Sequence, residues 1–425
     1  MPPADPSTYT IVTLGCPKNQ VDSDKLEGTL IADGLTAAAS ADTADVVVVN
    51  TCAFVEEART ESIETILSLS EQRRDGAKLV VTGCMAERHG AELAAELPEI
   101  DQIAPFGVSL GAAPSTSIPV SLGPTRRAPD FDLLNLPRPA SARPWAYVKI
   151  AEGCDRACGF CAIPSFRGPQ RSRSIDQILA EVDQLAAREI VLVAQDLAAY
   201  GRDQGVGERA IVPLVNEVAE VAERVRLLYL YPSDLTDELI DTICNTGVPY
   251  FDLSLQHVSP PLMRRMRRWG KSEVFLKRIA TIRGREPDAA FRSNFIVGYP
   301  GETEDDHDAL LDFVEEAQLD WCGFFAYSEE VGTYAADLDG KVDPGLMRER
   351  LGELQEMQDT ITATRRDLLV GREVEVLVDE PGIGRTHREA PEIDGVVSVA
   401  HDLPVGTFQT VTVTASVGPD LEAGQ

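Results

Sequence analysis

An alternation of apolar strands and helices through the middle of the chain constrains the fold more than any other feature. Because strand–helix alternation produces parallel sheets with right-handed crossovers, six such units predict an open (β/α)6 barrel. The active site of such a barrel lies at the carboxyl ends of its strands. We predict strands at residues 145–150, 190–194, 225–231, 250–255, 291–297 and 321–326, and helices at 174–188, 211–223, 235–245, 271–283 and 303–319.

Three cysteines follow the first of these strands. Cys154, Cys158 and Cys161 have the spacing C-x3-C-x2-C, and Phe160 directly precedes the third cysteine. Iron–sulfur clusters normally take four cysteines, so three thiolates leave one iron open for catalysis. A zinc site or a group of buried thiols is the alternative, but zinc knuckles contain two C-x2-C pairs or histidine. The spacing therefore predicts an iron–sulfur cluster with one open iron.

A second set of three cysteines lies in the N-terminal region. Strands are predicted at residues 9–14, 45–49 and 78–81, with helices at 22–32 and 56–72 between them, and Cys16, Cys52 and Cys84 come shortly after the three strands. In a parallel sheet the carboxyl ends of the strands form the ligand-binding edge. The alternative is three small core cysteines. The equivalent position after every strand favours a second three-cysteine site.

Composition limits the class of protein. The chain has 425 residues and eight cysteines, and without an export signal these favour metal binding or catalysis over disulfides. The net charge of −30 opposes binding to nucleic acid except where basic residues cluster. No apolar run approaches the ~18 residues of a membrane span. The first seven residues resemble a loose tail rather than a signal peptide, so we expect a cytoplasmic protein.

Further polar and glycine residues end strands on the predicted active-site edge of the barrel. The segment I-V-G-Y-P-G-E-T at residues 296–303 contains two glycines, which let a backbone approach a ligand closely. His257 fits either a site residue or a satisfied structural histidine, whereas Cys244 and Cys322 are expected in the core. Other polar residues at this edge are Asp196, Ser233, Gln256 and Ser293. The residues that we predict to bind a cofactor are Phe160, Gln195, Asn294, Gly298 and Gly301.

The densest basic cluster in this acidic chain consists of Arg264, Arg265, Arg267, Arg268 and Lys271. The cluster fits either a solvated helix face or a surface for RNA or an acidic partner. A long helix is predicted from residue 343 to 370, and alternating residues at 373–378 and 410–413 then predict a small β-barrel. This barrel has three arginines against ten carboxylates, which is a poor surface for nucleic acid.

Taken together, these blocks resemble the methylthiotransferase family along nearly the whole chain. The resemblance implies an N-terminal three-cysteine domain (8–110), a linker (111–143), a radical S-adenosylmethionine (radical SAM) barrel (144–370) and a TRAM-like β-barrel (371–425). Ala53 replaces a frequent glycine, and Leu197-Ala198 replaces Thr-Thr, but neither change touches a predicted ligand. The motifs resemble the branch that modifies a ribosomal protein more than the tRNA branch: L-G-C-P-K-N (14–19), N-T-C-A-F-V (50–55), K-I-A-E-G-C (149–154), C-A-I-P-S-F-R-G (161–168), A-Q-D (194–196) and A-P-E-I-D-G (390–395).

The resemblance also implies a reaction, in which S–CH3 replaces a C–H on the β-carbon of an aspartate in a small-subunit ribosomal protein, free or on the ribosome. One 4Fe-4S cluster, on Cys154, Cys158 and Cys161, would bind S-adenosylmethionine and produce a radical. A second, on Cys16, Cys52 and Cys84, would carry the sulfur, so all six cysteines would be catalytic.

Partners and rivals follow from the same resemblance. We expect a monomer with a flavodoxin- or ferredoxin-like electron donor and a sulfur donor that the sequence leaves open. One alternative is methylthiolation of tRNA adenosine by the same chemistry. The other is a non-catalytic, cluster-bearing RNA-binding protein.

Overall fold

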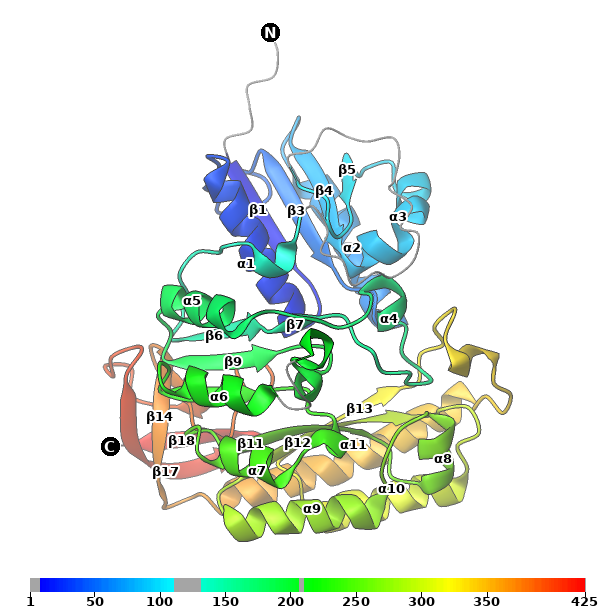
Figure 1. Cartoon of the computed structure of the whole chain (residues 1–425), viewed down its shortest axis with the longest axis vertical. Coiled ribbons are helices and arrows are strands. Elements are labelled where there is room, and N and C mark those ends of the chain that lie inside the picture. The colour runs from blue at the N-terminus through cyan, green and yellow to red at the C-terminus, as the bar shows by residue number, and fades with distance from the viewer. Residues whose placement is uncertain (1–7, 111–130, 206–209, 425) are drawn as a thin grey trace. The chain divides into compact units, whose positions relative to one another are not determined.

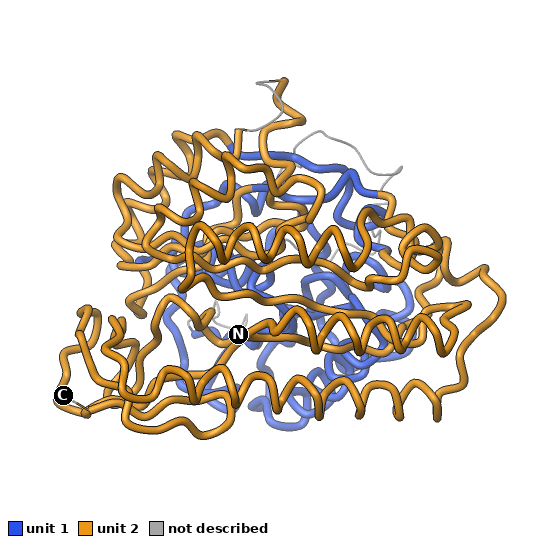
Figure 2. The backbone as a smooth tube through the Cα atoms, turned by 90° about the horizontal axis from the view of Figure 1, so that it is seen from below, with its two compact units in different colours: residues 1–140, 151–156, 162–173 blue, residues 141–150, 157–161, 174–425 orange. Residues whose placement is uncertain are grey.

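The computed structural model describes residues 8–110, 131–205 and 210–424 (Figure 1). The predicted N-terminal tail and most of the predicted linker lie outside the described residues. The chain divides into two compact units (Figure 2). Unit 1 contains residues 1–140, 151–156 and 162–173, and unit 2 contains residues 141–150, 157–161 and 174–425.

Unit 1 is built on a parallel sheet with the strand order β2-β1-β3-β4-β5. The central strand β3 is buried along its whole length, with Val47 and Val49 packed into one apolar cluster and Val46 and Val48 into another. Both faces of the sheet are therefore covered, as parallel sheets require. The strands are β1 (Thr8–Thr13), β2 (Thr36–Ala37), β3 (Val46–Thr51), β4 (Lys78–Gly83) and β5 (Gln102–Ala104), and the helices are α1 (Pro17–Ala32), α2 (Glu56–Gln72) and α3 (Cys84–Glu96).

Two later segments of the chain also belong to unit 1. The strands β7 (Ala151–Glu152) and β8 (Arg171–Ser172) pair antiparallel, and α4 (Ile163–Phe166) lies between them in sequence. Phe166 packs against the apolar cluster on one face of the sheet. Residues on both sides of the C-x3-C-x2-C motif thus group with the N-terminal sheet, which the sequence did not predict.

Unit 2 contains the predicted open barrel. Its parallel strands form two three-stranded sheets, β10-β9-β6 and β11-β12-β13, which a parallel bridge between Leu230 and Leu253 joins. The predicted (β/α)6 arrangement is confirmed. The strands are β6 (Trp145–Lys149), β9 (Glu189–Val193), β10 (Arg224–Leu227), β11 (Tyr250–Gln256), β12 (Ala290–Val297) and β13 (Trp321–Ala326), and the helices are α5 (Ile175–Leu185), α6 (Ile211–Ala219), α7 (Asp237–Cys244), α8 (Pro260–Arg265), α9 (Ser272–Arg285) and α10 (Glu304–Ala317).

The long helix and the small β-barrel follow. Helix α11 (Pro344–Asp367) begins after Asp343, whose Oδ1 accepts a hydrogen bond of 2.7 Å from the backbone N–H of Gly345. The helix packs along β13 and α10. The closed barrel has the strand order β14-β15-β16-β18-β17. Its strands are β14 (Glu373–Glu380), β15 (Ile383–Arg385), β16 (Val397–Ser398), β17 (Phe408–Val417) and β18 (Asp420–Gly424).

The small barrel packs against the amino-terminal ends of the strands of the open barrel. At the start of β13, Trp321 Nε1 donates a hydrogen bond of 2.7 Å to the carbonyl of Arg388, and Tyr147 Oη in β6 donates one of 2.7 Å to the carbonyl of Pro391. This contact leaves the carboxyl ends of the strands, where the cysteine motif begins, uncovered by the small barrel. None of the helices in the described residues combines the length and the apolar character needed to cross a membrane.

Candidate functional site

The three N-terminal cysteines lie at one edge of the unit 1 sheet. Cys16 precedes the first residue of α1, Cys52 follows β3, and Cys84 is the first residue of α3. The pairings of Thr13 with Asn50 and of Asn50 with Thr82 place the strand ends level with one another. A Cβ atom on Gly15 would lie 2.8 Å from Sγ of Cys52, so the loop before α1 closes directly onto that thiol.

Asn19, in the first turn of α1, ties the cysteine-bearing loops together. Its Nδ2 donates hydrogen bonds of 3.0 Å to the carbonyls of Leu14 and Thr51. Leu14 directly follows β1, and Thr51 is the last residue of β3. Its Oδ1 lies 3.6 Å from Sγ of Cys84. The side chain is fully buried. A single amide therefore fixes the spacing of three loops, a role that the L-G-C-P-K-N motif did not reveal by itself.

Arg167 adds a buried positive charge to the same edge. Its Nη2 donates to Sγ of Cys84 at 3.0 Å and to Oδ1 of Asn19 at 2.8 Å. Its Nη1 pairs with Asp22 at 3.0 Å and with Glu152 at 2.9 Å. The guanidinium also lies over the ring of Phe106, 4.1 Å from its centroid. Sequence reasoning placed Arg167 in a family motif but gave it no role.

The thiols at this edge differ in acidity. Burial raises the pKa of Cys16, but the charges of Lys18 and Arg167 and backbone N–H donors more than offset this and lower it overall. Burial and the neighbouring Cys84 raise the pKa of Cys52 to about 12. Burial also raises the pKa of Cys84, although Arg167 opposes the shift. The influence of neighbouring thiols on the pKa values of Cys52 and Cys84 agrees with the grouping of the three cysteines at one edge of the sheet.

The donor set of this site can be compared with those of known metal centres. Among the described residues, no three His, Cys, Asp or Glu side chains converge closely enough to hold one metal ion. Three soft thiolates, with backbone and guanidinium N–H groups directed at them, suit the donor set of an iron–sulfur centre.

The second three-cysteine set lies in the loop after β6. In unit 1, the backbone N–H of Cys154 donates to the carbonyl of Gly168 at 3.0 Å, and that of Arg156 donates to Sγ of Cys154 at 3.4 Å. In unit 2, the N–H of Gly159 donates to the carbonyl of Met266 at 2.8 Å. Cys154, Cys158 and Cys161 are all partly exposed. The loop is therefore fixed by backbone hydrogen bonds while its thiols stay accessible.

An arginine also contacts this set. Nη1 of Arg268 donates to Sγ of Cys158 at 3.4 Å, and its guanidinium lies 4.0 Å from the centroid of the Tyr231 ring. Arg268 also bonds to the carbonyl of Ser254. The basic cluster predicted from sequence is therefore divided, because Arg268 points inward to the cysteine loop while Arg264, Arg267 and Lys271 are exposed.

The predicted cofactor-binding residues have different surroundings. Oδ1 of Asn294, in β12, is buried and has no hydrogen-bond partner among the described residues, so it is available to a ligand donor. Gln195 is half-buried just after β9, and Phe160 packs beside the apolar cluster of Met266 and Tyr299.

The two glycines after β12 lie in close contact with other parts of the chain. Gly298 has a φ of +80°, and a Cβ atom there would overlap the side chain of Met347 in α11. Its N–H donates to Glu302 at 2.6 Å. The N–H of Gly301 donates to the carbonyl of Gly340 at 2.7 Å. The described contacts therefore give both glycines a role in close packing of the backbone.

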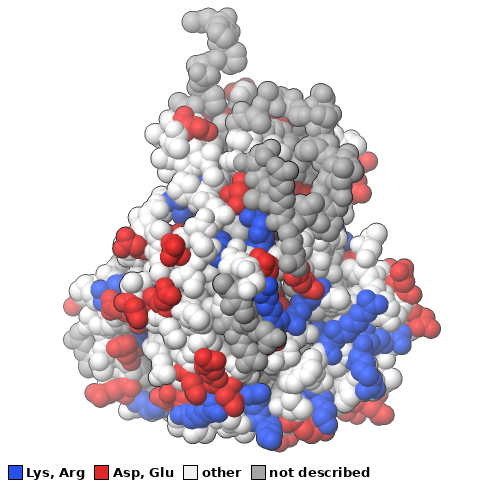
Figure 3. Space-filling view, in the orientation of Figure 1, with Lys and Arg blue, Asp and Glu red and all other residues white. Residues whose placement is uncertain are grey.

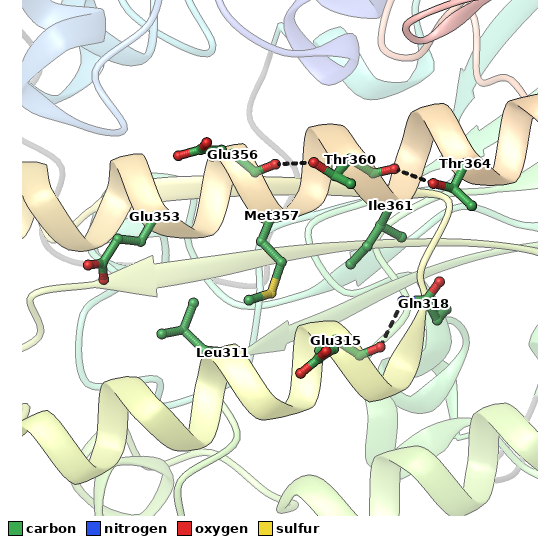
Figure 4. Close-up of a pocket in the computed structure, with 9 residues that line it drawn as sticks. All are labelled: Leu311, Glu315, Gln318, Glu353, Glu356, Met357, Thr360, Ile361 and Thr364. Atoms are coloured by element: carbon green, nitrogen blue, oxygen red, sulfur yellow. Dashed lines mark hydrogen bonds between the residues drawn. The ribbon is translucent and has the colours of Figure 1, made fainter.

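Three other predicted residues, all in unit 2, lie in or beside secondary-structure elements. His257 is fully buried, its Nδ1 accepts from the N–H of Ser259 at 3.1 Å, burial lowers its pKa to about 4, and its Nε2 has no hydrogen-bond partner among the described residues. Cys244 and Cys322 are partly rather than fully buried, because one ends α7 and the other lies in the edge strand β13. A groove between α10 and α11 contains none of the predicted site residues (Figure 4).

Comparison with known proteins identifies the family. Residues 8–105 match the model of uncharacterized protein family UPF0004, residues 148–314 match the radical SAM superfamily, and residues 370–425 match the TRAM domain. The ribosomal protein uS12 methylthiotransferase RimO of Kineococcus radiotolerans is 41% identical over 100% of this chain and 98% of its own length. The chain belongs to the RimO family.

Other RimO proteins support the assignment. The RimO of Moorella thermoacetica is 42% identical over 95% of this chain and 96% of its own, and that of Chloroflexus aurantiacus is 40% identical over 97% and 98%. As a RimO-family member, the chain is a radical SAM enzyme, a class that uses a 4Fe-4S cluster and S-adenosylmethionine. The radical SAM methyltransferase TsrM of Kitasatospora setae has 14% identity and a TM-score of 0.49, covering 75% of this chain and 72% of its own, a likeness too weak to carry an argument.

Proposed function

We infer that this protein is a methylthiotransferase that replaces a hydrogen on the β-carbon of an aspartate in ribosomal protein uS12 with a methylthio group, S–CH3. The observation that carries the inference is the full-length similarity to RimO proteins, which are named as uS12 methylthiotransferases. An unactivated C–H bond requires radical chemistry, which S-adenosylmethionine at a reduced cluster supplies.

Cys154, Cys158 and Cys161 are the residues that we assign to the radical cluster. Their loop follows β6, at the carboxyl end of the barrel strands where such sites lie. The backbone N–H of Arg156 and the guanidinium of Arg268 donate to Cys154 and Cys158. Such donors stabilise a thiolate over a thiol, because hydrogen bonds to the charged form favour it.

Cys16, Cys52 and Cys84 are assigned to a second 4Fe-4S cluster, which would hold the sulfur to be transferred. The match to UPF0004 over residues 8–105 and the grouping of these thiols at one sheet edge support the assignment. Asn19 fixes the loops, and Arg167 places a positive charge against Cys84. That charge offsets part of the negative charge that three thiolates bring into a buried site.

Contacts to S-adenosylmethionine are proposed for Phe160, Gln195, Asn294, Gly298 and Gly301, which lie at or near the carboxyl ends of the barrel strands. Asn294 has the strongest support, because its buried Oδ1 is free to accept a hydrogen bond from an ammonium group. Gly298 and Gly301 have weaker support, since packing against Met347 and Arg265 already explains the absence of their side chains.

A protein substrate is favoured over tRNA by the state of the terminal barrel. Arg385 and Arg388 are only 2% and 8% exposed. Arg385 pairs with Asp379 and Glu189, and Arg388 pairs with Asp288 at 2.8 Å. Arg372 pairs with the same Asp288 at 3.0 Å. All three arginines of this barrel therefore already have carboxylate partners, which leaves the barrel unsuited to binding phosphates.

The proposed domain arrangement follows the family matches. It consists of a sulfur-carrying domain (8–110), a linker (111–143), the radical SAM barrel (144–370) and a TRAM-like barrel (371–425). The proposed partners are uS12, free or in the small ribosomal subunit, and a flavodoxin- or ferredoxin-like electron donor. We propose that the enzyme acts as a monomer in the cytoplasm.

Mass spectrometry tests this function. The reconstituted enzyme is incubated anaerobically with S-adenosylmethionine, sulfide and a reductant, together with bulk tRNA and small ribosomal subunits. We expect a methylthio group on one aspartate of uS12 and unmodified tRNA. Methylthio-adenosine in the tRNA with unmodified uS12 would establish the tRNA alternative, and absence of 5′-deoxyadenosine would favour the non-catalytic protein.

A further inference from the structure

We propose that the exposed part of the basic cluster binds RNA beside the active site. This surface, the basic rim, consists of Arg264, Arg267, Lys271, Trp269 and Tyr334, all in unit 2. The proposal extends the proposed function, because a ribosomal protein lies against RNA and an enzyme that acts on it meets RNA at the same time.

The basic rim is positive in a chain with a net charge of −30. Figure 3 shows Lys and Arg side chains gathered over α8, at the lower right of the view. Arg264 is exposed, and no carboxylate pairs with it among the described residues. Within the part of the chain that the structure describes, Lys271 pairs only with the exposed Glu273, at 3.4 Å. An exposed pair of this kind contributes little, so both cations remain available to phosphates.

Two carboxylates in the segment around Tyr334 are already paired, whereas the exposed Asp337 has no ion pair among the described residues. Asp339, which is 99% exposed, accepts from Arg265 at 3.0 Å, and Lys341 pairs with Glu329. Arg265 and Lys341 therefore offset these two carboxylates, and Arg264 and Arg267 carry two positive charges against the single negative charge of Asp337. A phosphate backbone gains from such a local excess even when the whole protein is acidic, because salt screens charges more than about 10 Å away.

Exposed aromatic rings accompany the cations. Trp269 is 44% exposed and Tyr334 is 40% exposed, although large aromatic side chains are usually more deeply buried. The guanidinium of Arg267 lies 3.8 Å from the centroid of the Tyr334 ring. Arg267 adopts a φ of +54°, an unusual conformation for a residue other than glycine. Rings next to cations form the combination that unpaired bases and their phosphates recognise.

This combination favours RNA over a protein partner. The proposed substrate belongs to a class of basic proteins, which a group of unpaired cations would repel. An acidic protein would satisfy the cations but would not require the exposed rings. Single-stranded RNA satisfies both, since its phosphates pair with cations and its bases stack on aromatic rings.

The position of the basic rim connects it to catalysis. Met266 lies in the same segment, and its carbonyl accepts the N–H of Gly159 in the cysteine loop. Arg268, next in sequence to Arg267, donates to Sγ of Cys158. The N–H of Ala335, which follows Tyr334, donates to the carbonyl of Gly159 at 2.8 Å. RNA on the basic rim would therefore lie at the entrance to the radical site, beside the residue to be modified.

Binding of a labelled single-stranded RNA tests the proposal directly. Fluorescence anisotropy of an RNA of about 12 nucleotides is measured with the full-length protein over a range of salt concentrations. The variant R264E/K271E should weaken binding about tenfold or more and lower the salt dependence by about one to two phosphate contacts. W269A should also weaken binding, by about fivefold or more, with little change in the salt dependence.

A matched control separates the basic rim from net charge. R188E/R372E makes the same change in net charge with exposed arginines that pair with Glu223 and Asp288, away from the carboxyl ends of the barrel strands. Binding should fall much less in this variant. Equal loss in both variants, or unchanged binding in R264E/K271E, would overturn the proposal. Both variants should still release 5′-deoxyadenosine, which shows that they are folded.

Binding is then measured to small ribosomal subunits, to free uS12 and to tRNA. The comparison shows which of these partners the basic rim recognises, independently of whether the proposed function is correct. R264E/K271E should weaken binding to small ribosomal subunits and leave binding to free uS12 unchanged. Weaker binding to free uS12 alone would identify a protein-docking surface instead and overturn the proposal. Equal losses for tRNA and for subunits would show general RNA affinity, which supports the basic rim. Because no turnover is required, a failure to modify uS12 would leave this measurement interpretable.

Discussion

Arg167 and Cys84 are 83 positions apart in sequence, yet Nη2 of Arg167 lies 3.0 Å from the Cys84 sulfur. The same guanidinium pairs with Asp22 and Glu152, so one buried cation is shared by a thiol and two carboxylates. Arg167 comes six residues after Cys161, within the motif C-A-I-P-S-F-R-G that this cysteine begins. The segment that follows one cysteine set thus supplies the charge beside the other.

Replacing Arg167 should destabilise unit 1 and its cluster. Arg167→Gln leaves Asp22, whose side chain is 1% exposed, without a cationic partner, which costs about 3–5 kcal/mol. We expect a lower Tm and loss of iron from the N-terminal site, with 5′-deoxyadenosine still formed. R167Q/D22N should recover part of the stability. Arg171→Gln is the control, because Arg171 pairs with Asp132 but contacts no cysteine; equal iron loss there would contradict the assigned role.

Removing the N-terminal thiols should distinguish the iron content and the roles of the two clusters. With about four irons per cluster, reconstituted protein should hold about eight, and C16A/C52A/C84A about four. This variant should form 5′-deoxyadenosine but transfer no methylthio group. C244A/C322A should keep all the iron, since neither residue belongs to a three-cysteine set. Sulfur transfer by the triple variant would disprove the second cluster.

Gly298 should be needed for packing, whether or not it also contacts S-adenosylmethionine. Gly298→Ala places a side chain at a φ of +80° and against Met347, so we expect a loss of roughly 2–5 kcal/mol of unfolding free energy. G298A/M347A removes the overlap and should recover about half. Isothermal titration with S-adenosylmethionine on the double variant separates the two roles. Near-normal affinity would show packing alone, whereas lost affinity in a stable double variant would restore Gly298 to the cofactor site.

Glu189 should make stability depend on pH. Burial opposes its ionisation, but Arg226, Arg385 and Arg224 lower its pKa to about 2. Because this value lies below that of the unfolded chain, the stabilisation is fully present above about pH 5 and is lost as the pH falls towards 2. We expect Glu189→Gln to cost about 3–5 kcal/mol at pH 7 and less below pH 4. Urea unfolding at several pH values measures this.

The control for that prediction is Glu223→Gln. Glu223 pairs with Arg188, but both side chains are about half exposed, so the pair contributes at most about 1 kcal/mol. Its removal should change stability little at any pH. If Glu189→Gln lowered the free energy of unfolding equally at every pH, Glu189 would contribute through packing and hydrogen bonding rather than through its charge.

The sequence alone determined the positions of the six cysteines within the fold. Cys16, Cys52 and Cys84 follow strands, and in a parallel sheet every strand delivers its carboxyl end to the same edge. The spacing of Cys154, Cys158 and Cys161 is local, so it is visible without a structure. These features are periodic or short-range, which is why pattern reasoning could identify them.

Only the tertiary structure decided what surrounds those cysteines. Arg167 contacts Cys84, and Arg268 contacts Cys158 across 110 positions, through packing that no local pattern encodes. The same holds for Gly298, whose neighbour Met347 comes from a different helix, and for Arg385, whose charge is neutralised by Glu189 in a barrel strand. Contacts between distant segments depend on how whole elements pack, so charge and spacing in the sequence could name these residues but not their partners.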